Sequence, residues 1–377
     1  MDFSYSEEQQ MLQESVSKFV QRHYGFDSRK EILANPVGFS PENWRLFAEL
    51  GWLTVPFRVE DDGFGGFATD LMVIMEEFGK AMVVEPFVAT AVLGGGLISE
   101  LGSAQQKSEW LPELMGGNLQ LACALAEPDS RYNLASVTTT AVVQGDSLIV
   151  DGSKIMVLNG PAADQLLVSV RTAGADRDVH GISVLLIDAN SPGIHKHSYT
   201  NVDGHRAAEI TFSRVKVPVE RLLGAVDTAY AGLERMVDRA TLAVCAEAVG
   251  ALDSLLAKTV EYSKTRKQFG APIGSFQALQ HRMADMFIEC QLARSIVMMA
   301  AMRLDSDAPA ADKMRAVSAA KSRVGKAIRK VGQEAVQLHG GIGITDELDV
   351  GHIFKRVTAI ETLYGNTDFH TARFARS

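Results

Sequence analysis

The distribution of proline constrains the fold of this chain most, because proline interrupts a helix wherever it falls inside one. None of the 11 prolines lies between Pro218 and Pro272, and none follows Pro309. The sequence therefore predicts one very long helix over residues 227–266 and a second over residues 310–338. The C-terminal part of the chain is expected to be helical.

The middle of the chain has a different pattern. Short β-branched runs at residues 137–143 and 147–150 flank Gln144-Gly145-Asp146, which is typical of a hairpin. Further short runs of strand-forming residues follow at residues 166–170, 182–187 and 209–212. Several strands with tight turns and no helices between them indicate a small antiparallel barrel or sandwich.

The N-terminal part is predicted to be helical. Ser6, with Gln9 three positions later, forms a capping box. Apolar residues then recur on one helix face, at Met11, Leu12, Val16, Phe19 and Val20. The glycine cluster at residues 63–66 is predicted to be a plain turn, since no strand precedes it and no Lys-Ser/Thr follows. The outline is therefore a helical domain (1–117), a β domain (118–225) and a second helical domain (226–377).

The composition limits the partners that the chain can have. The net charge is −9 with a pI of about 5.5 and no run of lysine or arginine stands out, so neither nucleic acid nor a membrane is an expected partner. Three cysteines without CxxC spacing indicate a reducing compartment, no disulfide frame and no metal site. An acidic N-terminus without an apolar signal core predicts a cytoplasmic protein.

Two stretches of the C-terminal part carry residue types that bind nucleotides. One comprises residues 266–270, Arg-Lys-Gln-Phe-Gly, followed by Gln277; the other, residues 335–343, includes Gln337 and ends in Gly-Gly-Ile-Gly. An arginine at a helix end offers paired donors to a diphosphate, and glycine lets a backbone come close. The two stretches therefore suit the nucleotide end of a dinucleotide cofactor.

Together these stretches resemble the helical-domain signature of the acyl-CoA dehydrogenase flavoenzymes. Further matches to that family follow in order along the chain: Met1-Asp2-Phe3 with Glu7-Glu8-Gln9, Trp110-Leu111-Pro112 with Gly116-Gly117, Glu127-Pro128, Gly152-Ser153-Lys154, Asn159-Gly160 with Asp164, and Val215-Lys216-Val217-Pro218 with Leu222-Leu223-Gly224. The resemblance implies an α+β fold with an N-terminal helical domain, a central antiparallel β-barrel domain and a C-terminal four-helix bundle.

The resemblance also implies the reaction and its cofactor. Members of the family use FAD to desaturate an acyl-CoA thioester: a carboxylate takes the α-proton while the β-carbon passes hydride to the flavin. This chemistry needs a base near the α-proton, donors for the enolate oxygen and a hydride-accepting ring. The resemblance further implies electron-transfer flavoprotein as the electron acceptor and a role in fatty acid or steroid side-chain β-oxidation.

Five residues match the part of the family's pattern that holds the nucleotide end of FAD. The resemblance implies that Arg266 binds the diphosphate, that Phe269 packs on the adenosine side and that Gln277 forms a hydrogen bond there. It also implies that Gln337 and the Gly341 backbone reach the diphosphate from the far side. In the family these residues act in trans, on the flavin of a neighbouring subunit. Taken singly, Arg266 also suits a solvated helix end, and Gln337 a helix surface.

The part of the pattern that holds the flavin ring is altered. A threonine that touches the ring is replaced by Ala126, an aromatic beside it by Met156, and a threonine near its reactive nitrogen by Leu158. Two lost hydrogen bonds of roughly 0.5–1.5 kcal/mol each and a lost stacking contact of roughly 1–3 kcal/mol weaken ring binding by about 2–6 kcal/mol. That loss corresponds to an affinity lower by on the order of 30- to 10⁴-fold.

The catalytic base of the family is also missing. Its common position falls on Gly365 and its alternative position on Ala240, ten residues before Gly250, and neither side chain can take a proton. Two other carboxylates stay open. Glu247 lies two turns after Ala240 in an otherwise apolar run, where it is either a base with a raised pKa or one half of a pair across a subunit contact. Asp368 is either a base or a C-terminal surface charge.

Three interpretations follow. The favoured one is a small subunit of a heterotetrameric acyl-CoA dehydrogenase, which lends its nucleotide-binding residues to a flavin whose ring and base belong to a partner chain. The second is a self-sufficient homotetramer with Glu247 or Asp368 as an unusual base. The third is a non-catalytic scaffold subunit. The sequence does not identify the acyl chain of the substrate.

Overall fold

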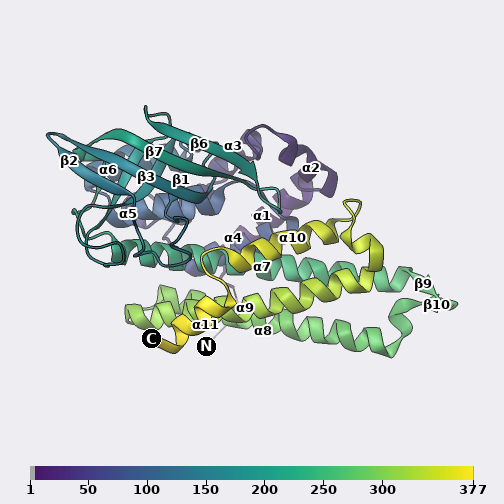
Figure 1. Cartoon of the computed structure of the whole chain (residues 1–377). Coiled ribbons are helices and arrows are strands. Elements are labelled where there is room, and N and C mark those ends of the chain that lie inside the picture. Colours follow the sequence, from purple (N-terminus) through teal and green to yellow (C-terminus); the bar gives the residue numbers. More distant parts are fainter. Residues whose placement is uncertain (1–4, 377) are drawn as a thin grey trace. The chain divides into compact units, whose positions relative to one another are not determined.

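The computed structural model describes residues 5–376 (Figure 1). Met1-Asp2-Phe3, which belongs to the family-like pattern, lies outside the described residues. Contacts divide the chain into two compact units. The first unit comprises Met1–Glu31, Ala68–Val83 and Thr241–Ser377, and the second comprises Ile32–Phe67 and Val84–Ala240. Because the units group segments that are distant in sequence, the domain boundaries expected after residues 117 and 225 stay predictions.

The first unit is built from helices. They are α1 (Glu7–His23), α2 (Phe26–Ala34, which continues into the second unit), α4 (Ala68–Ala81), α7 (Tyr230–Thr265, which begins in the second unit), α8 (Gln277–Asp305), α9 (Ala310–His339), α10 (Asp349–Thr362) and α11 (Thr367–Arg376). A small hairpin and two 3-10 helices connect them: β9 (Lys267–Gln268), β10 (Ala271–Pro272), η5 (Ile273–Ser275) and η6 (Gly340–Ile344).

The two long helices predicted from the proline spacing are confirmed. The helix expected over residues 227–266 is α7, and the helix expected over residues 310–338 is α9. At the end of α9, Gly340 has a φ of 66°, a conformation that favours glycine. The stop of this helix is therefore set by the residue type that the sequence provides.

The N-terminal helix α1 begins as expected, but its buried face is narrower. Ser6 Oγ accepts a hydrogen bond from the Gln9 backbone N–H, and the Gln9 side chain accepts one from the Ser6 backbone N–H, each at 3.2 Å. Val16 and Phe19 are buried, whereas Met11 is 72% exposed. The assignment of Met11 to the buried face was therefore wrong, because it lies in the solvent-facing part of the second helical turn.

The long helix α7 is a core helix. It is the one helix of residues 5–376 that is long and apolar enough to cross a membrane, but most of its apolar stretch is buried inside the protein. Gly79 on α4 and Gly250 on α7 allow the two helices to cross closely. A Cβ atom on Gly79 would overlap the carbonyl oxygen of Glu247, and one on Gly250 would overlap that of Glu76. The crossing fixes the part of α7 that carries Glu247.

The second unit combines a sheet with shorter helices. The helical elements are α3 (Pro41–Glu49), η1 (Trp52–Thr54), η2 (Val59–Asp61), the π-helix η3 (Val88–Gly95), α5 (Gly96–Leu101), α6 (Ala104–Met115) and η4 (Val219–Arg221). The strands are β1 (Leu121–Ala124), β2 (Thr140–Gln144), β3 (Ser147–Leu158), β4 (Gln165–Arg171), β5 (Ile182–Asp188), β6 (Ile194–Thr200), β7 (Arg206–Pro218) and β8 (Leu222–Leu223).

The strands form one mostly antiparallel sheet. Its order is β6-β7-β3-β2-β4-β5-β8, and β1 pairs with β4 in parallel. The predicted hairpin is confirmed, since Gln144 pairs with Ser147 across a two-residue turn, although β2 starts only at Thr140. The pairing runs from β6 to β8 as an open path, so the expected antiparallel barrel is a single sheet in which β4 pairs in parallel with both β1 and β2. The β3–β7 register shifts between Lys154 and Val157, which marks a β-bulge at Met156.

The residue cluster at 63–66 is the plain turn that the sequence predicts. The backbone N–H of Gly63 donates to the carbonyl of Arg58, and that of Gly65 donates to the carbonyl of Phe57. A Cβ atom on Gly63 would overlap the Phe57 carbonyl. The glycines are therefore explained by tight packing of the loop on itself, with no phosphate needed to account for them.

Candidate functional site

Three of the expected FAD-binding residues lie on or directly after the segment that joins α7 to α8. Arg266 follows α7 directly, and its carbonyl accepts a hydrogen bond of 2.8 Å from the Ile273 backbone N–H. Phe269 lies at the tip of the β9–β10 hairpin with a φ of 53°. Gln277 is the first residue of α8. The twelve residues from Arg266 to Gln277 therefore present an arginine, an aromatic and a glutamine around the hairpin.

The other two expected residues lie at the end of α9, and a ring contact ties this end to α7. Gln337 lies in the last turn of α9, and Gly341 lies in η6. Tyr262 on α7 stacks on His339 on α9, with ring centroids 4.4 Å apart and planes 26° from parallel. All five predicted residues thus belong to the first unit and to the same end of its long helices.

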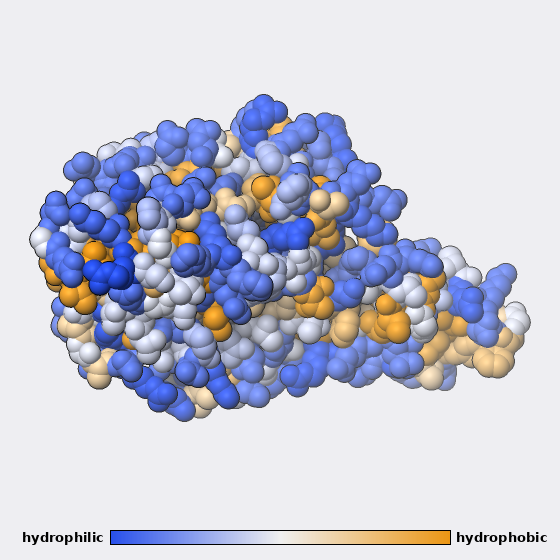
Figure 2. All heavy atoms as spheres, turned by 45° about the horizontal axis from the view of Figure 1, so that its top comes forward, coloured by the Kyte–Doolittle hydropathy of each residue, from blue (hydrophilic) through white to orange (hydrophobic). Residues whose placement is uncertain are grey.

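These side chains are directed to solvent. Phe269 is 94% exposed, Arg266 and Gln337 are exposed, and no residue within 5–376 forms an ion pair or a side-chain hydrogen bond with Arg266. At this end, which is at the right of Figures 1 and 2, polar and apolar residues lie side by side on the surface. A diphosphate and an adenosine require paired donors beside an aromatic. The residues present here fit the nucleotide end of FAD.

The residues at the ring-binding positions do not fit a flavin ring in the same way. The side chains of Ala126 and Leu158 have no atom that can form a hydrogen bond, and the Ala126 carbonyl already accepts from the Ile155 backbone N–H at 2.9 Å. Met156, at the β-bulge, has a φ of 52° and is 43% exposed. Its sulfur accepts a hydrogen bond of 3.1 Å from the Tyr199 hydroxyl. The aliphatic Met156 side chain offers no aromatic face for stacking.

Two family-like residues next to these positions have a structural role instead. Lys154 is 0% exposed, and its Nζ donates to Glu127 Oε1 at 2.7 Å and to Ser169 Oγ at 2.9 Å. Burial lowers the pKa of Lys154 to about 8, while Glu127 favours its charged form. Although burial opposes ionisation of Glu127, the Lys154 ammonium and hydrogen bonds from Thr138 lower its pKa to about 2. The sequence analysis missed this pair, whose local signals are a lysine within β3 and a glutamate three residues after β1.

Neither position of the missing base carries a proton acceptor. Ala240 is fully buried in α7. Gly365 is buried between α10 and α11 and has a φ of 116°. Of the substitutes considered, Asp368 is exposed in the first turn of α11. A carboxylate there stabilises the positive end of the helix dipole, which agrees with a surface role.

Glu247 is not a lone carboxylate. Its Oε1 accepts from Arg356 Nε at 2.6 Å and its Oε2 accepts from Arg356 Nη2 at 2.7 Å. Both residues are buried, so the pair joins α7 to α10 inside the first unit. The expectation that Glu247 is a lone carboxylate or pairs across a subunit contact was therefore wrong, because its partner is an arginine 109 positions away in the same chain. Its role as a base stays a prediction.

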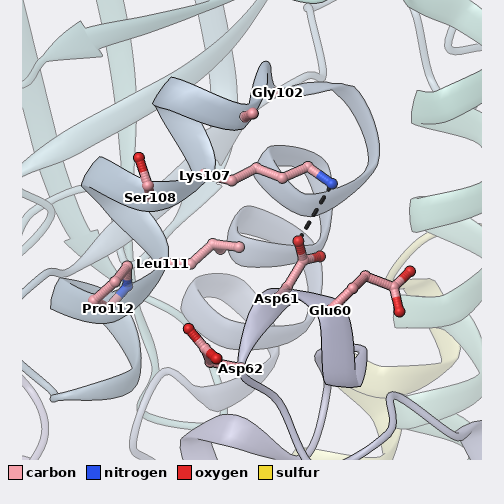
Figure 3. A pocket seen from close by; sticks show the side chains of 9 residues that line it. Glu60, Asp61, Asp62, Gly102, Lys107, Ser108, Leu111 and Pro112 are labelled. Atoms are coloured by element: carbon pink, nitrogen blue, oxygen red, sulfur yellow. Dashed lines mark ion pairs between the residues drawn. The ribbon is translucent and has the colours of Figure 1, made fainter.

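A separate hollow lies in the second unit, between η2 and α6 (Figure 3). Asp61 faces Lys107 there, with Nζ and Oδ1 3.4 Å apart, and also accepts a hydrogen bond of 2.5 Å from Ser99 Oγ. None of the predicted site residues lines it. Among residues 5–376, no group of three or more histidine, cysteine or acidic side chains is arranged to hold a metal ion.

Models of one protein family match almost the whole chain. The acyl-CoA dehydrogenase N-terminal domain matches residues 6–118, the middle domain residues 122–215 and the C-terminal domain residues 233–377. Acyl-CoA dehydrogenase FadE12 of Mycobacterium tuberculosis is 31% identical over 92% of this chain and 90% of its own length. Probable acyl-CoA dehydrogenase YngJ of Bacillus subtilis is 29% identical over 100% of this chain and 99% of its own length.

A solved structure with the same fold is the ChsE4-ChsE5 complex from Mycobacterium tuberculosis. One of its chains is 26% identical, with a TM-score of 0.89 over 100% of this chain and 98% of that one. The chain belongs to the acyl-CoA dehydrogenase family. The predicted fold class of a helical, a β and a second helical domain is thereby confirmed, with an open sheet in place of the barrel. The cofactor of this family of oxidoreductases is FAD.

Proposed function

We propose that this chain is the small subunit of a heterotetrameric acyl-CoA dehydrogenase, which binds the nucleotide end of an FAD whose ring and base belong to a partner chain. One observation carries the proposal. The five residues for the nucleotide end are present and exposed, whereas the positions for the ring and the base hold Ala126, Met156, Leu158 and Gly365. A chain that acts only in trans retains the first set and loses the second.

Each retained residue has a defined task in this arrangement. The Arg266 guanidinium pairs with diphosphate oxygens, and the Phe269 ring covers the adenosine. Gln277, Gln337 and the Gly341 N–H add hydrogen bonds from the two sides. FAD held by these residues would supply the hydride acceptor for the β-carbon of the acyl-CoA. The base that takes the α-proton is supplied by the partner, because Ala240 and Gly365 cannot accept one.

The energetics favour binding at the nucleotide end only. Charge-assisted hydrogen bonds from an arginine to phosphate are worth about 1.5–3 kcal/mol each. The ring-side substitutions remove about 2–6 kcal/mol from the chain's own half-site. A partner with an intact ring-binding half therefore retains the flavin better than this chain does. The partner is expected to carry the tryptophan, the two threonines and the glutamate that this chain lacks.

The remaining features of the proposal concern the wider reaction. Electron-transfer flavoprotein is the proposed electron acceptor, and β-oxidation of a fatty acid or a steroid side chain is the proposed context. The proposed location is the cytoplasm. A solved relative, the ChsE4-ChsE5 complex, consists of two different chains, which supports a heteromeric assembly for a chain of this type.

The test is the FAD content of the chain alone and with its partner. Purified alone, the chain is expected to contain little FAD, and co-purified with a partner that carries the missing residues, it forms a yellow complex. Arg266→Ala and Gln337→Ala in this chain are expected to lower the flavin content and turnover of the complex. Arg45→Ala, at an exposed surface arginine on α3 that pairs with Glu49, is the matched control and leaves both unchanged.

Other outcomes identify the alternatives. A stoichiometrically loaded chain that becomes reduced on adding an acyl-CoA, without a partner, indicates a self-sufficient homotetramer. Unchanged flavin content and turnover in the Arg266→Ala and Gln337→Ala complexes indicate a scaffold subunit.

A further inference from the structure

We infer that Lys321 and His370 hold the turn at residues 363–366 in a form that excludes every side chain at position 365, so that this subunit cannot regain a base there. The inference deepens the proposed function, on which it rests in one respect: the chain's own base position is unused. The turn joins α10 to α11 in the first unit. Its conformation is determined by contacts with α9.

The main contact is a buried ammonium group. Lys321, on α9, is 1% exposed. Its Nζ donates to the carbonyl oxygens of Ile360 at 2.7 Å, Leu363 at 2.6 Å and Gly365 at 2.8 Å, and to that of Glu361 at 3.1 Å. Burial lowers the pKa of Lys321 to about 8, while four carbonyl oxygens favour the charged form. One side chain thus binds the last carbonyls of α10 and the backbone of the turn together.

The second contact fixes the other side of the turn. His370 Nε2 lies 3.0 Å from the Tyr364 carbonyl oxygen, and its Nδ1 lies 3.4 Å from Ser318 Oγ. Burial lowers the pKa of His370 to about 4, so the ring is neutral at pH 7. A carbonyl only accepts hydrogen bonds, so Nε2 carries the proton and Nδ1 is the acceptor. The imidazole is therefore held against the turn by its hydrogen bond to Tyr364.

The start of α11 is packed equally closely on α9. Thr367 donates its backbone N–H and its hydroxyl to Glu361 Oε1, at 3.0 and 2.9 Å. A Cβ atom on Gly325 of α9 would overlap Thr367 Oγ1. Ser318, Lys321 and Gly325 share one face of α9, at helical spacing. This face of α9 packs against the turn and the first residues of α11.

These contacts leave no space for a side chain at position 365. Gly365 has a φ of 116°, which residues with a Cβ rarely adopt. A Cβ atom would lie 2.5 Å from His370 Nε2 and 2.5 Å from Phe369 Cδ1. The loss of the base is therefore more than a missing carboxylate. His370 and Phe369 fill the space that a side chain at position 365 would enter. Lys321 fixes the backbone at that position.

The first experiment compares two glycines in the purified full chain. Gly145, in the β2–β3 turn, has a φ of 64° and a Cβ atom there would meet nothing within 4 Å. Gly145→Ala therefore measures the conformational cost alone, and it is expected to lower the Tm by no more than about 2 °C. Gly365→Ala combines a φ of 116°, which is less accessible to alanine than 64°, with the steric overlap, and is expected to lower the Tm by at least about 4 °C. Equal, small shifts for the two variants overturn the inference.

The second experiment tests whether Lys321 acts through the turn. In the Lys321→Met background the turn is released from α9, so Gly365→Ala is expected to lower the Tm by less than half as much as in the native background. An equal shift in both backgrounds shows that Lys321 does not set the turn and contradicts the inference. If Lys321→Met does not fold, the comparison of Gly365→Ala with Gly145→Ala decides alone.

The third experiment asks whether a base can be restored. Gly365→Glu is expected to lower the Tm and to give no acyl-CoA-dependent flavin reduction beyond that of the native complex. A Gly365→Glu complex with the native Tm and faster flavin reduction overturns the inference. The Tm comparisons do not depend on the proposed function, because they need only the purified full chain. Failure of the proposed function is shown separately, by unchanged flavin content in the Arg266→Ala complex.

Discussion

Replacing Arg356 with methionine tests whether Glu247 is a structural residue. The substitution preserves much of the side-chain volume but removes the cation that both Glu247 oxygens contact at 2.6 and 2.7 Å. Only 3% of Glu247 and 7% of Arg356 are exposed, so water cannot replace the lost partner. Breaking a buried ion pair by removing one partner costs about 3–5 kcal/mol. We expect the free energy of unfolding of Arg356→Met to decrease by that amount.

Two further variants separate the pair from its surroundings. Replacing both residues, with Glu247→Leu and Arg356→Met together, leaves no unpaired charge and is expected to recover most of the loss. Lys18→Met is the matched control, because Lys18 contacts Glu14 at 2.9 Å on the surface of α1. An exposed pair of this kind is worth about 0.2–1 kcal/mol. Urea unfolding followed by circular dichroism measures all three variants.

A catalytic role for Glu247 gives a different result. Glu247→Gln would then abolish acyl-CoA-dependent flavin reduction while the midpoint of urea unfolding stayed near that of the native chain. Our interpretation predicts the opposite, a large loss of stability with native turnover per folded complex. A stable and inactive Glu247→Gln variant would refute the structural interpretation.

Two other predictions concern the second unit. Glu127→Gln is expected to reduce the loss of unfolding free energy between pH 4.5 and pH 2. The folded-state pKa of Glu127 is about 2, below the ordinary 4.5, so its stabilising contribution is present above pH 4.5 and is lost as the pH falls towards 2. Acid unfolding identical to that of the native chain would contradict this. Ala126→Thr, Met156→Trp and Leu158→Thr together are expected to tighten FAD binding by the isolated chain on the order of 30-fold or more, by restoring about 2–6 kcal/mol of ring contacts; a fluorescence titration with an unchanged Kd would contradict this.

Local signals in the sequence predicted much of the fold. The absence of proline between Pro218 and Pro272 fixed the extent of α7, because helix continuity depends on nearest neighbours. The Ser6 capping box and the two-residue β2–β3 turn are also local, and both were found. The parallel pairing of β1 with β4 was not predicted, because Leu121 and its partner Gln165 are far apart in sequence and no local pattern sets the pairing.

How well the candidate site could be predicted also depended on how far apart its residues lie in the sequence. The short segment with Arg266 and Phe269 could be recognised from consecutive residues. The pairing of Glu247 with Arg356 could not, since 109 positions separate them, and a single acidic residue in an apolar helix looks the same whether it is a base or half of an ion pair. The four carbonyl oxygens around Lys321 could not be predicted either, because every residue type has a backbone carbonyl and the sequence does not show which of them accept.

The FAD-to-protein ratio of the purified chain, with and without its partner, tests the central claim most directly. A subunit that holds only the nucleotide end of the cofactor retains little flavin alone, and its partner's flavin content falls when Arg266 is replaced by alanine. One FAD per chain in the isolated protein, bound beside Met156 and Leu158, would contradict the claim.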